Sequence, residues 1–269
     1  MFLLEQSGPV EPRMKLIPEK TAIPSQFPRI VRPRLIALLE RSMESCSATI
    51  VSGRAGTGKS ALAISFALAC GRPVAWYKAD ASDLDLRVFL RYLVSSIAQQ
   101  KPGFGDPTQV SLVGREPDPM AFADLLVHKL LEYDGSPLVI VLEDLHLLCE
   151  SDWLVPFLCR LLPLLPRSVH MLITSRTMPP APLWRMRSKQ TLEVIDEATL
   201  AFTRQEAVEL FETYGLSREQ ACVARDHSKG RAGALALCAI TLSESEATPT
   251  NHLTECDRPE GKLPESRLG

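Results

Sequence analysis

The sequence lacks several features that mark whole classes of protein. Its 30 Lys and Arg against 32 Asp and Glu leave a formal net charge of −2, and no stretch gathers the basic residues into a stripe. Because clustered Lys and Arg supply most of the affinity for nucleic acid, we expect no direct DNA binding by this chain. No apolar run is long enough to span a bilayer, and residues 1–4 are too short for the apolar core of a signal peptide. We therefore expect a cytoplasmic protein that makes no membrane contact.

The seven cysteines lack any pattern of a metal site or a disulfide framework. They are odd in number, scattered and without a Cys-x-x-Cys pair: Cys46, Cys70, Cys149, Cys159, Cys222, Cys238 and Cys256. Scattered thiols of this kind are typical of reduced cytosolic proteins. We interpret them as structural rather than catalytic.

Segments with the signatures of strands and helices alternate through the first 200 residues. We predict strands at residues 48–52, 74–77, 137–142, 170–174 and 190–195. The predicted helices lie at residues 33–42, 59–70, 86–100, 119–132 and 153–164. The third strand is apolar throughout, as expected for a parallel strand covered on both faces. This alternation predicts an α/β fold in which helices sandwich a five-stranded parallel sheet.

The two ends of the chain differ in composition from the middle. Residues 1–29 are rich in proline and charge, which predicts an extended arm. Residues 30–199 form the predicted α/β domain. Residues 200–242 have a wholly helical pattern with two capping boxes, which predicts a small C-terminal helical subdomain. Residues 243–269 have few apolar side chains to offset the entropy of ordering, so we expect a disordered tail.

A glycine-rich segment lies between the first predicted strand and the helix that follows it. Residues 53–60 read Gly-Arg-Ala-Gly-Thr-Gly-Lys-Ser, the pattern of a P-loop, in which glycines let backbone N–H groups converge on phosphates. A chance glycine-rich turn would lack the flanking strand and helix. Lys59 is expected to reach the β- and γ-phosphates of ATP, and the Ser60 hydroxyl to bind Mg²⁺. The residues predicted to contact the nucleotide are Gly53, Ala55, Gly56, Thr57, Gly58, Lys59, Ser60 and Ala61. Arg54 is expected to be solvated.

Two predicted strand ends carry charged residues that suit phosphate chemistry. Glu143 and Asp144 directly follow five apolar residues, where a P-loop protein needs an acidic partner for Mg²⁺. Asp144 is a candidate to orient or deprotonate an attacking water. Arg176 follows the fourth strand at the carboxyl edge of the sheet, where it would sense or stabilise γ-phosphate charge. A solvated strand end and a surface arginine are the alternatives at these positions.

Several separate segments together resemble one family of ATPases. They are residues 15–18 (Lys-Leu-Ile-Pro), 31–35 (Val-Arg-Pro-Arg-Leu), the P-loop, 75–77 (Ala-Trp-Tyr) with Asp80, 142–146 (Leu-Glu-Asp-Leu-His), 174–176 (Thr-Ser-Arg), and 200–203 (Leu-Ala-Phe-Thr) with Glu206. In this order they resemble the STAND class of signal-transducing P-loop ATPases, most closely the nucleotide-binding domain of MalT/LuxR-type ATP-dependent transcriptional regulators. The combination is more specific than the P-loop alone. The likeness begins at Lys15, which makes Met14 an alternative start of translation.

The resemblance also implies roles for single residues. Val31 and Arg32 would lie against the adenine end of the nucleotide, and Arg176 would take a sensor position near the γ-phosphate. Glu143 would hold Mg²⁺ together with Ser60, although the family usually has Asp at that position.

Two further departures from the family stand out. Gly230-Arg231 stands where the family often has Gly-Trp. Relatives continue into winged-helix, helical-repeat and DNA-binding domains, whereas the present sequence stops after the first helical subdomain.

The sequence therefore predicts an ATP-binding regulatory switch, a slowly hydrolysing ATPase module whose helical elements respond to the γ-phosphate. ATP, ADP and Mg²⁺ are its expected ligands, and a protein partner or the effector domains of a longer regulator are its expected partners. Two alternatives stay open. One is a small-molecule or nucleotide kinase built on the same P-loop, although neither an acceptor pocket nor an arginine-rich lid is identifiable. The other is a non-functional fragment of a larger transcriptional regulator.

Overall fold

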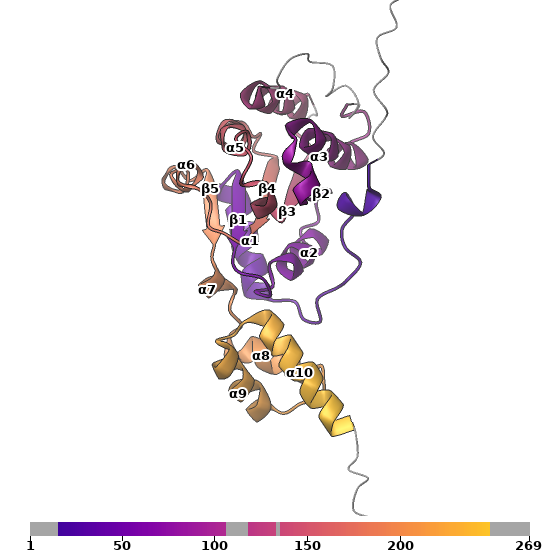
Figure 1. Ribbon diagram of the computed structural model, residues 1–269, viewed down its shortest axis with the longest axis vertical. Helices are drawn as coiled ribbons and strands as arrows, with labels where there is room; N and C mark the ends of the chain where they lie inside the picture. The colour runs from indigo at the N-terminus through magenta and orange to yellow at the C-terminus, as the bar shows by residue number, and fades with distance from the viewer. Residues whose placement is uncertain (1–15, 106–117, 133–134, 248–269) are drawn as a thin grey trace, which may run out of the picture.

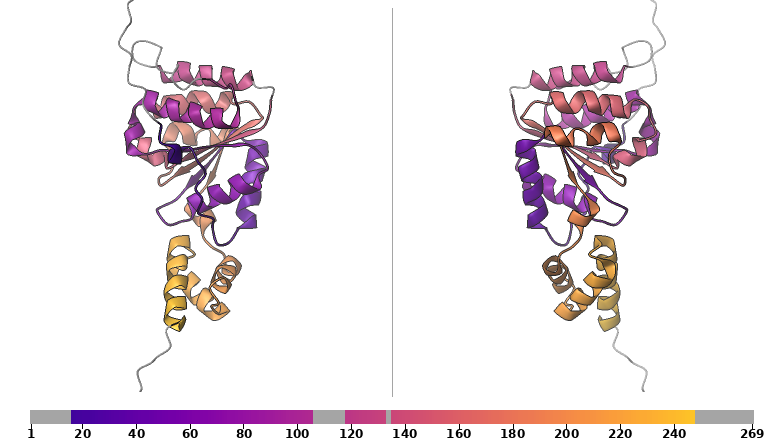
Figure 2. Two further views of the ribbon diagram at one scale, coloured as in Figure 1. Left: turned by 90° about the vertical axis from the view of Figure 1, so that its right-hand side faces the viewer. Right: turned by 90° about the vertical axis from the view of Figure 1, so that its left-hand side faces the viewer.

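The computed structural model describes residues 16–105, 118–132 and 135–247 (Figure 1). Within these ranges an α/β domain adjoins a cluster of helices at residues 202–247, which we call the helical unit. Helices cover both faces of the sheet in the α/β domain (Figure 2). In the part of the chain so described, no helix is long and apolar enough to cross a membrane.

The sheet consists of five parallel strands in the order β2-β3-β4-β1-β5. The strands are β1 (Ala48–Ser52), β2 (Val74–Lys78), β3 (Leu138–Glu143), β4 (Val169–Ser175) and β5 (Leu192–Ile195). β1, β3 and β4 are buried at every position, because strands flank them on both sides and helices cover both faces. The predicted α/β fold with a five-stranded parallel sheet is thus confirmed.

Two apolar cores separate the sheet from its covering helices. One core includes residues of α3 (Leu86–Gln100), α4 (Pro119–Leu131) and α5 (Leu154–Leu161), and the other includes residues of α1 (Pro33–Ser45) and α2 (Lys59–Ala69). Alternate residues of β2 contribute to the two cores, Tyr77 to the first and Trp76 to the second. This alternation is the two-residue period of a strand with both faces covered.

Some predicted helix ends were wrong by a few residues. The predicted helix at residues 153–164 is α5 followed by a 3-10 turn, Leu162–Leu164, because Pro163 has no N–H to continue the α-helical pattern. Helix α1 extends three residues beyond its predicted end at position 42. Short elements that the pattern did not predict are α6 (Ala181–Trp184), α7 (Glu197–Leu200) and the 3-10 turns Pro18–Lys20, Ala81–Leu84, Leu145–Leu148 and Arg187–Lys189.

The helical unit contains α8 (Arg204–Glu212), α9 (Arg218–Ser228) and α10 (Ala232–Ala247) around a small apolar core of its own. Both predicted capping boxes are present, Thr203 with Glu206 and Ser217 with Gln220. The predicted start of the tail at position 243 is wrong, because α10 continues to Ala247. Its Ser, Glu and Ala residues are compatible with a helix end. The rest of the predicted tail, residues 248–269, lies outside the described residues.

The N-terminal arm follows the outside of the α/β domain into α1 (Figure 1). It was predicted to be extended, but Pro18–Lys20 form a 3-10 turn and Lys20 is buried. Residues 22–29 contain neither helix nor strand. Residues 1–15 of the predicted arm lie outside the described residues.

Candidate functional site

The P-loop, residues 53–60, connects the carboxyl end of β1 to the start of α2. The Gly53 N–H donates to the Ser175 carbonyl at 3.2 Å, which ties the loop to the end of β4. Gly56 and Gly58 have φ of 76° and 89°, a left-handed conformation that a residue with a Cβ adopts only with strain. The loop therefore curls as a phosphate-binding nest requires.

The ammonium group of Lys59 lies over the loop backbone. Its Nζ donates to the carbonyls of Gly53 at 2.6 Å and Arg54 at 3.0 Å, and the residue is 7% exposed. The Thr57 hydroxyl donates to the same Arg54 carbonyl at 2.8 Å, a further hydrogen bond within the loop. Burial lowers the pKa of Lys59, and the charge of Asp144 opposes that shift. The lysine is thus fixed where the loop concentrates positive potential.

The acidic pair, Glu143 and Asp144, lies at the same edge of the sheet as the P-loop. Because β4 separates β1 from β3, the pair is set back from the loop by one strand. Glu143 is 2% exposed, and its Oε2 atom has no hydrogen-bond partner among the described residues. Burial raises the pKa of Glu143, while a hydrogen bond from Ser60 acts in the opposite direction.

These features of Glu143 and Ser60 fit a hard divalent cation. A buried carboxylate oxygen without a partner is costly, and Mg²⁺ prefers oxygen ligands of the carboxylate and hydroxyl type. The residues that the sequence assigned to Mg²⁺ are therefore brought together.

Asp144 has a left-handed backbone, with φ of 60°. Its N–H donates to the Thr174 hydroxyl of β4 at 3.0 Å, and its Oδ1 lies 3.8 Å from Nδ1 of His146. A strained backbone is held only where surrounding contacts fix it, and such residues gather at functional sites. The Thr174 bond is one contact that holds the backbone of this residue in place.

Arg176 follows β4 directly and is exposed. Its positive charge is one of the smaller effects that lower the pKa of Lys59 and of His146, after the burial of each group. The guanidinium group therefore shares the electrostatic environment of the P-loop and the acidic pair.

The two residues predicted at the adenine end differ in their surroundings. Val31 is 54% exposed, whereas Arg32 is 5% exposed. Arg32 Nη1 donates to the Leu200 carbonyl at 2.7 Å, and Nη2 donates to the Gly58 carbonyl at 3.4 Å. Its guanidinium also lies 4.7 Å from the ring centre of Phe202. Arg32 thus joins the end of the P-loop to the segment that leads into the helical unit.

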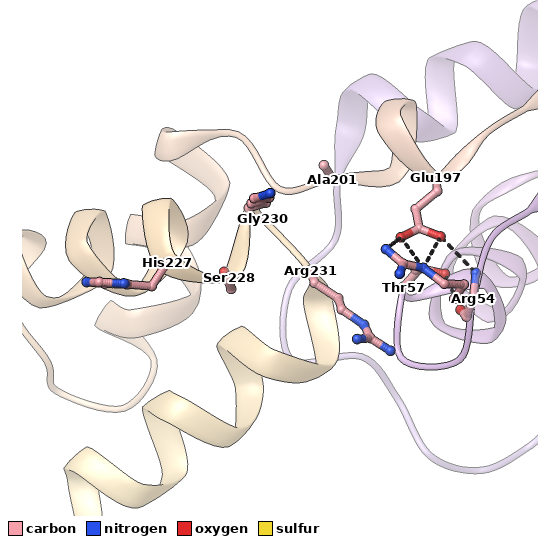
Figure 3. Close-up of a pocket in the computed structure, with 9 residues that line it drawn as sticks. Arg54, Thr57, Glu197, Ala201, His227, Ser228, Gly230 and Arg231 are labelled. Atoms are coloured by element: carbon pink, nitrogen blue, oxygen red, sulfur yellow. Dashed lines mark hydrogen bonds and ion pairs between the residues drawn. The ribbon is translucent and has the colours of Figure 1, made fainter.

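Glu197 is a neighbour of the P-loop that the sequence did not reveal. Its carboxylate accepts hydrogen bonds from the Arg54 N–H at 2.9 Å and from the Arg54 guanidinium at 2.7 and 3.0 Å (Figure 3). The side chain of Arg54 is 75% exposed, in agreement with the expectation that it is solvated, but its pairing with Glu197 was not predicted. A pairing across 143 positions of sequence leaves no local signal.

Arg231 is the second neighbour of the loop that the sequence did not reveal. Its side chain extends from the start of α10 toward the P-loop (Figure 3), where Nη2 donates to the Ala55 carbonyl. The Gly233 N–H donates to the Gly56 carbonyl at 2.7 Å. The sequence shows Arg231 where the family often has Trp, but it gave no sign that Arg231 contacts the P-loop. Arg54, Glu197 and Arg231 line a cavity of about 180 Å³ between the loop and the helical unit.

The fold and this site define a P-loop ATPase domain, and comparison with known proteins supplies its family. Residues 32–173 match the family described as the AAA ATPase domain, which is more than half of the chain. The chain belongs to this family.

Two relatives are regulators of transcription. The chain is 29% identical over 239 residues to the HTH-type transcriptional regulator MalT of Yersinia enterocolitica and 27% identical to that of Serratia proteamaculans. Each match covers 87% of this chain and 26% of the relative, so the chain spans about a quarter of the length of these regulators. The similarity confirms the resemblance to the nucleotide-binding domain of MalT-type regulators.

Solved structures support the fold. One match is a protein from Pyrococcus horikoshii of the STAND class (signal transduction ATPase with numerous domains), which has a tetratricopeptide repeat sensor. It matches with a TM-score of 0.58 at 18% identity. The match covers 80% of this chain and 30% of that one. A chain of the Drosophila ORC bound to DNA matches with a TM-score of 0.51 at 15% identity, over 90% of this chain and 66% of that one. At such identities the likeness concerns the fold alone.

Proposed function

We propose that this chain is a nucleotide-dependent switch that binds ATP with Mg²⁺ and hydrolyses ATP slowly. The observation that carries the proposal is the direct contact between the helical unit and the P-loop. Arg231 donates to the Ala55 carbonyl and the Gly233 N–H to the Gly56 carbonyl, so the first turn of α10 holds two consecutive peptides of the loop. A change in loop conformation on nucleotide binding would therefore act directly on α10.

The residues around the loop would divide the work of holding the nucleotide. Lys59 would contact the β- and γ-phosphates, and Ser60 with Glu143 would hold Mg²⁺, which neutralises phosphate charge when it is bound. Asp144 would orient or deprotonate the attacking water, and Arg176 would respond to the γ-phosphate. Val31 and Arg32 would lie toward the adenine.

The link between the two parts of the molecule supports a coupled response. Arg34 donates to the carbonyls of Thr199 and Ala201 at 2.7 and 2.6 Å and pairs with Glu206 of α8 at 2.9 Å. Together with Arg32, it holds the connecting segment against the α/β domain. We propose that further domains or a protein partner receive the movement of α10.

Hydrogen exchange at the amides of residues 231–236 tests the switch. We expect the exchange rates of these amides to differ between the ATP·Mg²⁺ and ADP states, because the loop contacts made by Arg231 and Gly233 change. Melting temperature provides the binding measurement, since a ligand bound only by the folded state stabilises it. Both effects should vanish in Lys59→Ala and persist in the matched control Lys189→Ala, which alters an exposed lysine outside the site. Identical exchange in the ATP, ADP and ligand-free states would refute the switch.

A further inference from the structure

The N-terminal arm is fastened to the α/β domain by a buried lysine. Lys20 is 7% exposed, and its Nζ lies 2.6 Å from Oδ1 of Asp83 and 2.8 Å from Oδ2 of Asp80. The same ammonium lies 4.4 Å from the ring centre of Tyr92 in α3. Asp83 is fully buried, so Lys20 supplies the countercharge that its carboxylate needs.

The arm is held again at its other end, by the helical unit. The Arg29 guanidinium lies 4.1 Å from the ring centre of Tyr214, and Ile30 packs on the core of the helical unit. Residues 22–28, which we call the strap, therefore run from an anchor on the edge of the α/β domain to an anchor on the helical unit (Figure 1).

Between its anchors the strap forms one wall of a cavity of about 330 Å³. The same cavity is also lined by Ser60 and Glu143, the proposed Mg²⁺ ligands, and by Lys78 of β2. The strap contributes Pro24, Gln26, Phe27 and Pro28 to the lining. Ile23 packs on the core that includes α1 and α2, whereas Phe27 is 69% exposed. The part of the strap that lines the cavity, residues 24–28, is therefore held mainly at its two ends.

We propose that the strap closes the metal side of the nucleotide site and limits the rate at which nucleotide leaves. Lys20 is a positioning residue in this arrangement, because it acts on the site only through the strap. The second anchor makes closure depend on where the helical unit lies. The inference rests on the proposed nucleotide binding and assigns to that site a covering element.

Dissociation of a fluorescent ADP, followed after a chase with excess ADP in Mg²⁺, tests the strap. Lys20→Met with Asp83→Asn releases the first anchor without leaving a buried charge unpaired, and Arg29→Met releases the second. Each variant is expected to raise the dissociation rate by about tenfold, because loss of a covering contact acts chiefly on the off-rate. The control, Lys129→Met with Glu132→Gln, removes an exposed pair in and after α4 and should leave the rate unchanged.

The outcomes distinguish a failure of the strap inference from a failure of the proposed nucleotide binding. Arg29→Met changes only a surface contact of the arm, so it stays informative if the buried double variant folds poorly. Rates within twofold of the parent in both anchor variants would overturn the inference and make Lys20 purely structural, whatever the change in melting temperature. If the parent binds no fluorescent ADP, the proposed function fails, and the role of the strap falls with it.

Discussion

His170 shows how a single buried residue links the fold to pH. It is 2% exposed in β4, with Nδ1 3.1 Å from the Cys46 carbonyl and Nε2 3.0 Å from the Thr49 hydroxyl. A carbonyl only accepts, so Nδ1 carries the proton and Nε2 of the neutral ring accepts from Thr49. Burial lowers the pKa of His170 to about 4.

Because the pKa of His170 is lower in the folded state than in the unfolded state, the unfolded chain binds more protons between these two values. The stability associated with the neutral ring is present above the unfolded pKa of 6.5 and is lost as pH falls toward 4. Between pH 7 and pH 5 we expect a loss of about 2 kcal/mol in the free energy of unfolding from this residue. Urea denaturation at both values should show a smaller pH dependence in His170→Gln than in the parent. The exposed-residue variant His227→Gln should keep the parental dependence, and an undiminished dependence in His170→Gln would contradict the assignment.

For single residues, the sequence predicted those whose surroundings are set by their immediate neighbours in the chain. The P-loop lysine and the acidic pair were identified because a strand and a helix adjoin them in the chain. The pairing of Arg54 with Glu197 was missed because it depends on where α7 lies after folding. Arg32 was placed near the nucleotide, but its bonds to Leu200 and Gly58 appear only once the chain has closed on itself.

The turn between α9 and α10 packs closely against Phe202, the first residue of the helical unit. The Phe202 N–H donates to the Gly230 carbonyl at 2.8 Å. Gly230 has φ of 75°, and a Cβ there would lie 2.6 Å from the Phe202 carbonyl oxygen. The backbones at Gly230 and Phe202 therefore approach more closely than any side chain at position 230 would allow.

Gly215 provides a matched control for this contact, since it also has φ of 75° but has open space where a Cβ would lie. Gly215→Ala should cost roughly 1–2 kcal/mol of unfolding free energy from the left-handed backbone alone. Gly230→Ala should cost about 1–3 kcal/mol more, because the new methyl group also meets backbone atoms. Urea denaturation of both variants measures the difference. Equal losses of unfolding free energy in the two variants would show that the backbone around Phe202 moves away from the new methyl group at little cost.

Elements were predicted well where local chemistry defines them. The capping boxes of α8 and α9 fixed both helix starts, and the apolar run of β3 fixed a central strand. The end of α10 was missed because residues rich in Ser and Glu suit a helix terminus as well as a disordered tail. The turn at Pro18–Lys20 was missed because its stability comes from the distant carboxylates of Asp80 and Asp83.

For the whole molecule, the decisive feature is that three segments far apart in sequence meet at one loop. Arg32 reaches Gly58, Glu197 reaches Arg54, and the start of α10 reaches Ala55 and Gly56. Each contact uses backbone groups of the loop, and the contacts from the start of α10 tie the conformation of the loop to the helical unit. Local sequence patterns carry no information on such meetings, which is why the parts were predicted and their arrangement was not.

Three charged residues at the carboxyl ends of β3 and β4 lead us to expect slow ATP hydrolysis by this chain. Glu143 has one methylene more than the Asp usual in the family, and Mg²⁺ tolerates little distortion of its ligand shell. Asp144 has a short side chain on a strained backbone held by Thr174, which limits its reach to an attacking water. Arg176 lies on the same domain, where it suits sensing of phosphate better than completing the transition-state charge.

Steady-state phosphate release at saturating ATP and Mg²⁺ measures this expectation. The parent should turn over well below the range of about 1–100 s⁻¹ that is typical of kinases. Asp144→Asn should reduce the rate further by about 10²-fold or more if this carboxylate acts as the base, whereas Glu143→Gln should chiefly raise the Mg²⁺ concentration needed for half-maximal rate. The control Glu150→Gln, an exposed carboxylate beyond the pair, should match the parent. Turnover at tens per second would rule out a slow switch, and an unimpaired Asp144→Asn would remove Asp144 as the base.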